Sequence, residues 1–64
     1  MAGRVLNVEF NEVDSTNRMT IQSGKHTQYA TVSKQHYDDV VRDTGRSLWG
    51  MDVIVEDGVI TVDD

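Results

Sequence analysis

The sequence has no cysteine, no proline and only four aromatic residues (one Trp, two Tyr and one Phe) among its 64 positions. Without cysteine there are no disulfide bridges, cysteine-based zinc sites or thiol nucleophiles. A chain of this length suits one small domain, expected to span residues 1–64, that buries only about 60% of its unfolded surface. Such domains usually need a disulfide, a metal or a partner chain for stability. Self-association is the remaining route, and a homodimer is its simplest form.

Long apolar segments are also missing. No run approaches the roughly 20 apolar residues of a membrane helix. The stretch MAGRVLNVEF has no apolar segment typical of a signal peptide. These features favour a soluble intracellular protein of the cytoplasm, without a membrane partner.

Positive charge is scarce. Six Lys and Arg residues stand against 11 Asp and Glu residues, which gives a formal net charge of −5. Residues 1–32 sum to zero, so residues 33–64 carry the whole excess. Excess negative charge repels phosphate backbones and anionic lipids, and it suits a basic surface. The charge therefore predicts a protein partner with a basic surface and argues against nucleic acid.

The first part of the chain alternates between apolar and polar residues. In VLNVEFNEV, the side chains of Leu6, Val8 and Phe10 point one way, which is typical of a half-buried strand. The segment RMTIQ resumes the alternation after the turn-forming DSTN. A four-residue loop at 14–17 would place Phe10 opposite Ile21 on a common apolar face.

A second turn is expected around SGKH, where Gly24 supplies the unusual backbone angles. A three-residue turn at 24–26 would place Tyr29 opposite Ile21 and extend the same apolar face. The first 32 residues therefore predict a three-stranded meander.

The periodicity changes after Ser33, where Tyr37, Val40 and Val41 follow helical spacing. Ser33 is a good N-cap, and Gly45 suits the left-handed position that ends many helices. We expect one short helix over about residues 34–44. Because an isolated helix of this length is unstable in water, it must pack on the sheet.

The C-terminal stretch predicts a hairpin. Asp57-Gly58 between two Val/Ile runs is among the strongest short signals for a tight turn. A two-residue loop pairs Glu56 with Val59 and places Ile54 and Val59 on a second face. The first face then collects the side chains of Val53, Val55, Ile60 and Val62.

The expected element order is β-β-β-α-β-β, which belongs to the α+β class. It suits a five-stranded antiparallel sheet with one short helix across a face. The OB barrel shares this order, with its helix between the third and fourth strands, so a small barrel is an alternative. The comparison rests on element order alone.

Residue types that carry catalysis lack the spacing that catalysis needs. General acid–base chemistry needs a carboxyl group in a pocket, whereas the acids here lie on expected solvent faces and in a turn. His36 is within helical reach of Asp39 and Asp43, but a lone histidine near a helix start is more often a surface residue than a ligand. Ser33 and Ser47 lack a G-x-S-x-G context. We expect no enzymatic activity and no metal or other cofactor.

Trp49 has two interpretations. It can close the end of a thin core beside Leu48 and Met51, since small domains depend on their few aromatic residues. It can instead stand partly exposed between Arg46 and Asp52, which is the composition of an interface hot spot. On the second interpretation, the candidate partner-binding residues are Trp49, Asp52, Ile54, Glu56, Val59, Asp38 and Asp39.

These features favour a non-enzymatic, acidic protein-interaction module. It would occupy a basic or nucleic-acid-binding surface of a partner, and small virus-encoded inhibitors often act as such nucleic acid mimics. The alternative is a minimal OB-like barrel that binds nucleic acid through stacking aromatic residues with basic neighbours. The assignment of Phe10 and Tyr29 to the core face leaves that platform bare.

Overall fold

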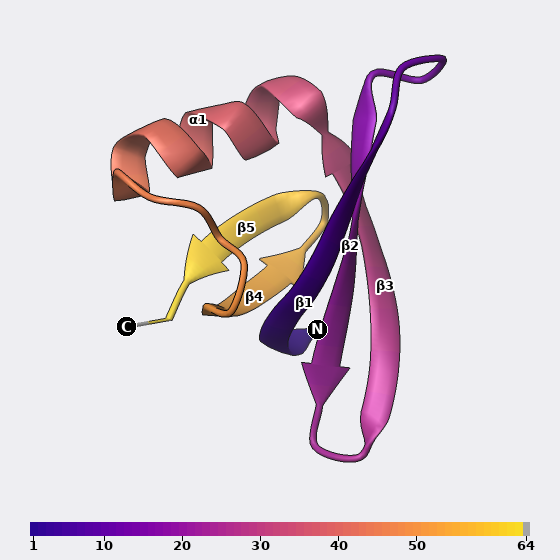
Figure 1. Cartoon of the computed structure of the whole chain (residues 1–64), viewed down its shortest axis with the longest axis vertical. Coiled ribbons are helices and arrows are strands. Elements are labelled where there is room, and N and C mark those ends of the chain that lie inside the picture. Colours follow the sequence, from indigo (N-terminus) through magenta and orange to yellow (C-terminus); the bar gives the residue numbers. More distant parts are fainter. Residues whose placement is uncertain (64) are drawn as a thin grey trace.

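The computed structural model describes residues 1–63 and has the expected β-β-β-α-β-β order. Its five antiparallel strands form one sheet in the order β3-β2-β1-β4-β5, which does not close into a barrel. Figure 1 shows β1, β2 and β3 running along the long axis and the β4–β5 hairpin crossing it beneath the helix. The elements are β1 (Ala2–Asn11), β2 (Thr16–Ser23), β3 (His26–Ser33), α1 (Lys34–Thr44), β4 (Asp52–Glu56) and β5 (Val59–Val62).

Strand β1 joins the β1–β3 meander to the β4–β5 hairpin. Residues 2–4 pair with β4, and residues 4–11 pair with β2. Gly3 lies at this junction, where a Cβ atom would come within 2.3 Å of the Gln22 carbonyl oxygen. The crossing of the two parts therefore requires a residue without a side chain at Gly3.

The β1–β2 pairing differs from the expected register. The turn occupies residues 12–15, so Phe10 pairs with Asn17 and Val5 pairs with Ile21. The displacement by an even number of residues keeps Val8 and Phe10 on the face expected for them, but Phe10 lies outside the core there and is 53% exposed. An irregularity between Val5 and Asn7 buries Val5 and turns Leu6 outward, so the prediction that Leu6 belongs to the core face is wrong.

The β2–β3 turn is shorter than expected. Gly24 and Lys25 alone form it, and Ser23 pairs with His26. Tyr29 consequently pairs with Thr20, whereas Ile21 pairs with Gln28. A register slip of one residue moves a side chain to the opposite face of a sheet. Tyr29 therefore lies on the outer face and is 59% exposed, which corrects its assignment to the core.

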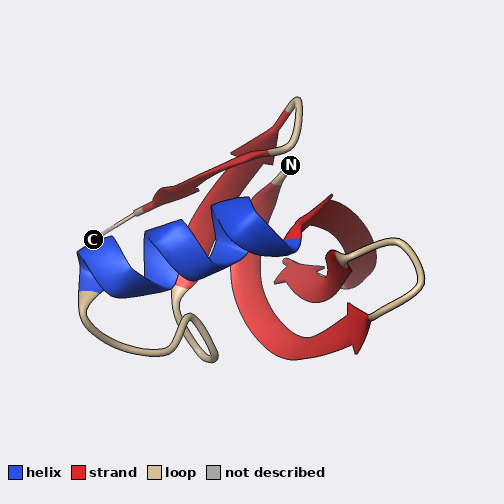
Figure 2. Cartoon of the chain, turned by 90° about the horizontal axis from the view of Figure 1, so that it is seen from above, coloured by secondary structure: helices blue, strands red, loops and turns tan. Residues whose placement is uncertain are grey.

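The helix begins and ends where the sequence predicts. The hydroxyl of Ser33 accepts a hydrogen bond from the His36 amide, and the amide of Gly45, at φ 81°, donates to the Val41 carbonyl. Figure 2, seen from above, shows α1 crossing over the curled sheet. Its half-buried residues Tyr37, Val40 and Val41 pack against the core.

The C-terminal hairpin confirms the predicted register. Glu56 pairs with Val59 across a two-residue turn in which Asp57 and Gly58 have φ values of 52° and 75°. Positive φ at both central residues is the signature of a type I′ turn. The core-facing residues of the hairpin join a cluster formed by Val5, Met19, Ile21, Ala30, Val32, Leu48, Val53, Val55 and Ile60.

Among the residues that the structure describes, no helix is long and apolar enough to cross a membrane.

Candidate interaction surface

The β4–β5 hairpin presents an outer face that combines apolar and acidic side chains. Ile54 and Val59 project from this face and are 37% and 54% exposed. The cross-strand pairs Ile54–Thr61 and Glu56–Val59 place both on the side opposite the core, as the two-residue turn predicts. We call this surface the outer hairpin face, formed by Asp52, Ile54, Glu56, Val59 and Thr61.

Among residues 1–63, the acidic groups around this face lack ion pairs. Within residues 1–63, no cation approaches the carboxylates of Asp52, Glu56, Asp57 and Asp63 closely enough to form one. Arg4 lies opposite Asp52 in the β1–β4 pairing but forms no ion pair with it. The amino terminus donates to the Val55 carbonyl at 3.2 Å. These four carboxylates are therefore available to a partner.

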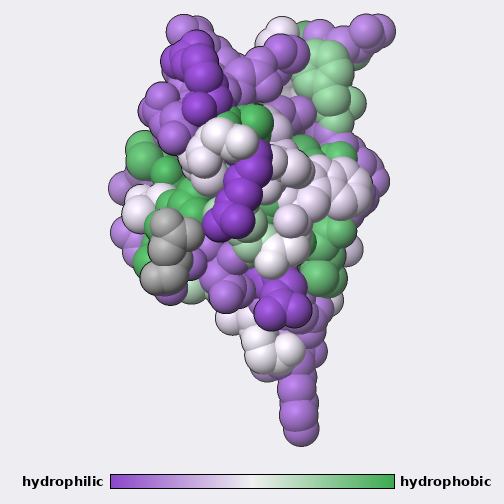
Figure 3. Space-filling view, turned by 60° about the vertical axis from the view of Figure 1, so that its left-hand side comes forward, coloured by the Kyte–Doolittle hydropathy of each residue, from purple (hydrophilic) through white to green (hydrophobic). Residues whose placement is uncertain are grey.

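Figure 3 views the molecule from the side that is on the left in Figure 1, where the C-terminal end of α1 and β5 lie. Hydrophilic side chains cover most of that side, and the hydrophobic ones form separate areas between them. An apolar contact made on such a surface would be surrounded by polar groups, just as the centre of a typical interface is surrounded by a polar rim.

Trp49 is half exposed, at 52%, and Leu48 takes the core position instead. The amide of Met51 donates to the Leu48 carbonyl, and Gly50 has a φ of 80°. This combination is a type II turn with Trp49 at its second position. The structure thus supports the exposed interpretation of Trp49.

The loop that carries Trp49 is fixed to the sheet. The Gly50 amide donates to the Val5 carbonyl at 2.7 Å, and the Val5 amide donates to the Met51 carbonyl at 2.9 Å. Trp49 therefore projects from an anchored backbone, so the loop loses little backbone freedom on binding. A groove brings it together with Arg46 from the preceding segment and with Asp52 and Asp63 from the hairpin. Asp52 makes this groove continuous with the outer hairpin face.

Asp38 and Asp39 lie elsewhere. Both are on α1, where Asp38 forms an ion pair with Lys34 and Asp39 forms one with Arg42. They line a separate groove beside Ser33. The structure therefore brings five of the seven candidate residues into one surface and places Asp38 and Asp39 on another.

A second surface, the outer face of β1–β3, was not predicted from the sequence. Arg18 lies 5.4 Å from the centre of the exposed Tyr29 ring and donates to Glu9 at 3.0 Å. The signal was present in Gly24-Lys25, because glycine at the first position of a two-residue turn predicts a type II′ hairpin. That register would have placed Tyr29 outside.

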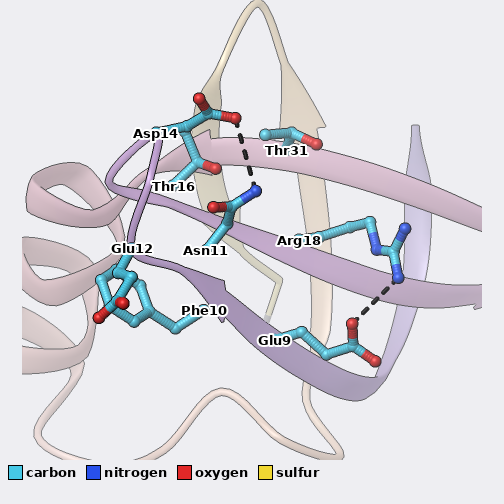
Figure 4. Close-up of a pocket in the computed structure, with 8 residues that line it drawn as sticks. All are labelled: Glu9, Phe10, Asn11, Glu12, Asp14, Thr16, Arg18 and Thr31. Atoms are coloured by element: carbon cyan, nitrogen blue, oxygen red, sulfur yellow. Dashed lines mark hydrogen bonds and ion pairs between the residues drawn. The ribbon is translucent and has the colours of Figure 1, made fainter.

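A hollow near the β1–β2 turn collects three acids, but they do not converge. Figure 4 shows Glu9 directed toward Arg18 and Asp14 toward Asn11, with Glu12 apart from both pairs. No group of His, Asp or Glu among residues 1–63 is arranged to hold a metal ion.

Two titratable residues of α1 serve the fold. Burial and, to a lesser extent, the nearby Asp38 carboxylate raise the pKa of Tyr37. His36 Nε2 accepts a hydrogen bond from the Ile60 amide at 2.8 Å. His36 thus joins α1 to β5.

Comparison of the chain with protein-family models, with curated proteins and with solved structures found no match.

Proposed function

We propose that the protein is a non-enzymatic interaction module that binds the basic surface of a partner protein through the outer hairpin face and Trp49. The observation that carries this proposal is the pair Ile54 and Val59, exposed beside the carboxylates of Asp52 and Glu56, which form no ion pair within residues 1–63.

The chemistry of the surface suits such a partner. Apolar side chains supply the buried centre of an interface, and a rim of charged groups supplies orientation and speed of association. Trp49 adds a large ring on an anchored loop, and tryptophan is enriched among the residues that dominate binding energies. A partner surface with an apolar patch surrounded by Lys and Arg would complement both the apolar side chains and the carboxylates of this face. A surface that normally binds nucleic acid has this basic character, which supports inhibition by mimicry of nucleic acid charge.

The test is capture of the partner from an extract of the source cell, read by mass spectrometry, with three proteins compared. Ile54→Asp places a charge in the apolar centre and should abolish capture of proteins that the wild type retains. Val13→Asp is the matched control, because Val13 is 89% exposed in the β1–β2 turn and takes no part in the surface. Both variants should keep the wild-type circular dichroism spectrum. Equal capture by Ile54→Asp and the wild type would contradict the proposal.

A second candidate function is binding of single-stranded nucleic acid on the outer face of β1–β3. Exposed Tyr29 with Arg18 against its ring favours it, because stacking aromatic residues with basic neighbours form such sites. The ion pair of Arg18 with Glu9 and the net charge of −5 oppose it. We therefore expect no affinity for a labelled oligonucleotide at physiological salt. Micromolar binding that weakens with salt and disappears in Tyr29→Ala would favour this second function.

A further inference from the structure

Strand β3 ends the sheet with one side unpaired. The Lys34 amide, just beyond the strand, donates to the Ser15 carbonyl at 2.8 Å. Backbone groups of an antiparallel strand point alternately to its two sides. Because Lys34 is bonded on the β2 side, the even-numbered residues of β3 direct their backbone amides and carbonyls toward β2. The amides and carbonyls of Thr27, Tyr29 and Thr31 consequently point to the open side. Figure 1 shows β3 at the boundary of the molecule, with no element beyond it.

The other edge of the sheet is protected. Strand β5 spans only Val59–Val62, and its outward amide at Ile60 is bonded to His36. Short length and cover by another element are two of the ways in which proteins prevent an edge from pairing with another chain.

The edge of β3 has none of these protections. It spans eight residues with the sequence HTQYATVS, which contains no Asp, Glu, Lys, Arg, Pro or Gly and shows no irregularity in its pairing with β2. Thr, Tyr and Val are among the residues that favour strands. An exposed edge of this kind is complementary to another extended strand.

We propose that β3 pairs antiparallel with β3 of a second copy, about a two-fold axis at Tyr29, so that two sheets become one. In this register, Tyr29 faces Tyr29 of the second copy, and Thr27 faces Thr31. Each outward-facing amide and carbonyl of Thr27, Tyr29 and Thr31 then has a partner. The two tyrosine rings lie side by side on the outer face, where aromatic cross-strand pairs add stability.

The charge distribution favours a second copy as the occupant. The protein carries a net −5, so two copies repel each other wherever their acidic surfaces meet. Strand β3 carries no Asp, Glu, Lys or Arg, and Arg18 beside Tyr29 is paired with Glu9. Pairing along the β3 edge therefore brings two copies together without placing like charges opposite each other. It does not include the outer hairpin face, so the pairing is independent of the proposed function.

The primary test is the molar mass in solution, measured by light scattering from micromolar to millimolar concentration. We expect the mass of the wild type to rise from 7.2 kDa toward twice that value. Thr31→Pro removes an outward amide and leaves the bonds to β2 in place. It should raise the dimer dissociation constant at least about tenfold, since two main-chain hydrogen bonds are lost across the two-fold axis. Ile54→Asp, on the outer hairpin face, should dimerise like the wild type.

A pair of double variants tests the register and covers the case in which Thr31→Pro does not fold. Thr27→Lys with Thr31→Glu places opposite charges across the axis, whereas Thr27→Lys with Thr31→Lys places like charges there. Dimerisation of the first should be about tenfold tighter than that of the second. A wild type that stays monomeric at millimolar concentration would overturn the proposal. So would a monomeric Ile54→Asp, equal dimerisation of the double variants, or a folded Thr31→Pro that dimerises like the wild type.

Discussion

His36 and Ile60 connect the helix to the edge of the sheet. The imidazole Nε2 of His36 accepts the Ile60 amide at 2.8 Å, which places the proton of the neutral ring on Nδ1. The bond satisfies a backbone donor on β5 that no strand can reach. A histidine interpreted from the sequence as a surface residue is therefore a structural link.

Replacement of His36 by Ala should lower the free energy of unfolding by about 1–2 kcal/mol, because a partly buried amide loses its acceptor. His26→Ala is the matched control, since His26 is exposed beside the β2–β3 turn, and it should change stability little. Urea denaturation of both variants measures the difference. Equal stabilities would show that water replaces the imidazole without loss.

Gly3→Ala should destabilise the protein by about 1–3 kcal/mol, the usual range for overpacking. The added methyl group would meet the Gln22 carbonyl oxygen at 2.3 Å and the Ile21 side chain at 2.8 Å. Gly24→Ala provides the comparison, because a Cβ there meets no atom within 4 Å and only its φ of 61° opposes the change. Thermal unfolding should rank Gly3→Ala below Gly24→Ala. The reverse order would contradict the close crossing at the junction.

Gly58→Ala should lower stability by roughly 1 kcal/mol, the cost of a left-handed residue that carries a Cβ atom. Gly58 has a φ of 75° and open space around it, so the backbone alone opposes the substitution. For a domain of this size, the melting temperature should fall by roughly 4–8 °C. Asp57→Gly, at the neighbouring positive φ of 52°, should not lower it. An unchanged melting temperature in Gly58→Ala would contradict the turn.

Tyr37 should make the protein less stable in alkali. Tyrosine in the unfolded chain ionises near pH 10, and burial together with Asp38 raises the pKa of Tyr37 in the folded state. Above about pH 10 the unfolded state therefore binds fewer protons, and stability falls as pH rises. Tyr37→Phe should reduce this slope in denaturation measured at several pH values. Tyr29→Phe, at an exposed ring, should retain it.

Local signals made the helix and the C-terminal hairpin predictable. Ser33 and Gly45 determine the ends of α1 through hydrogen bonds within a few residues. Asp57-Gly58 determines the hairpin register because a two-residue turn permits only one pairing of its neighbours. In both cases the residues that decide the structure are adjacent in sequence.

The pairings of the meander could not be read in the same way. Alternation identifies the faces of a strand but not the length of the loop that joins it to the next one. Val8 and Phe10 kept their faces because the β1–β2 register moved by an even number of residues. Tyr29 changed faces because the β2–β3 turn is one residue shorter than expected. The outward position of Leu6 depends on an irregularity in β1 that alternation cannot show.

The candidate surface was predictable to the extent that it follows from the hairpin. The faces of Ile54 and Val59 came from the turn, whereas the exposure of Trp49 depends on Leu48 filling the core. The remote position of Asp38 and Asp39 depends on how α1 packs, which periodicity alone does not determine.

The junction in which β1 pairs with β4 has a consequence for the order of folding. It joins residues 2–4 to 52–54, whereas each hairpin joins neighbouring segments of the chain. Closure of a longer loop costs more entropy, so the hairpins and α1 should form first and the junction last. A weakened junction should then mainly accelerate unfolding and leave the rate of folding almost unchanged. The pairing of residues 2–4 with residues 52–54 should therefore control the rate of unfolding, and with it the lifetime of the native state.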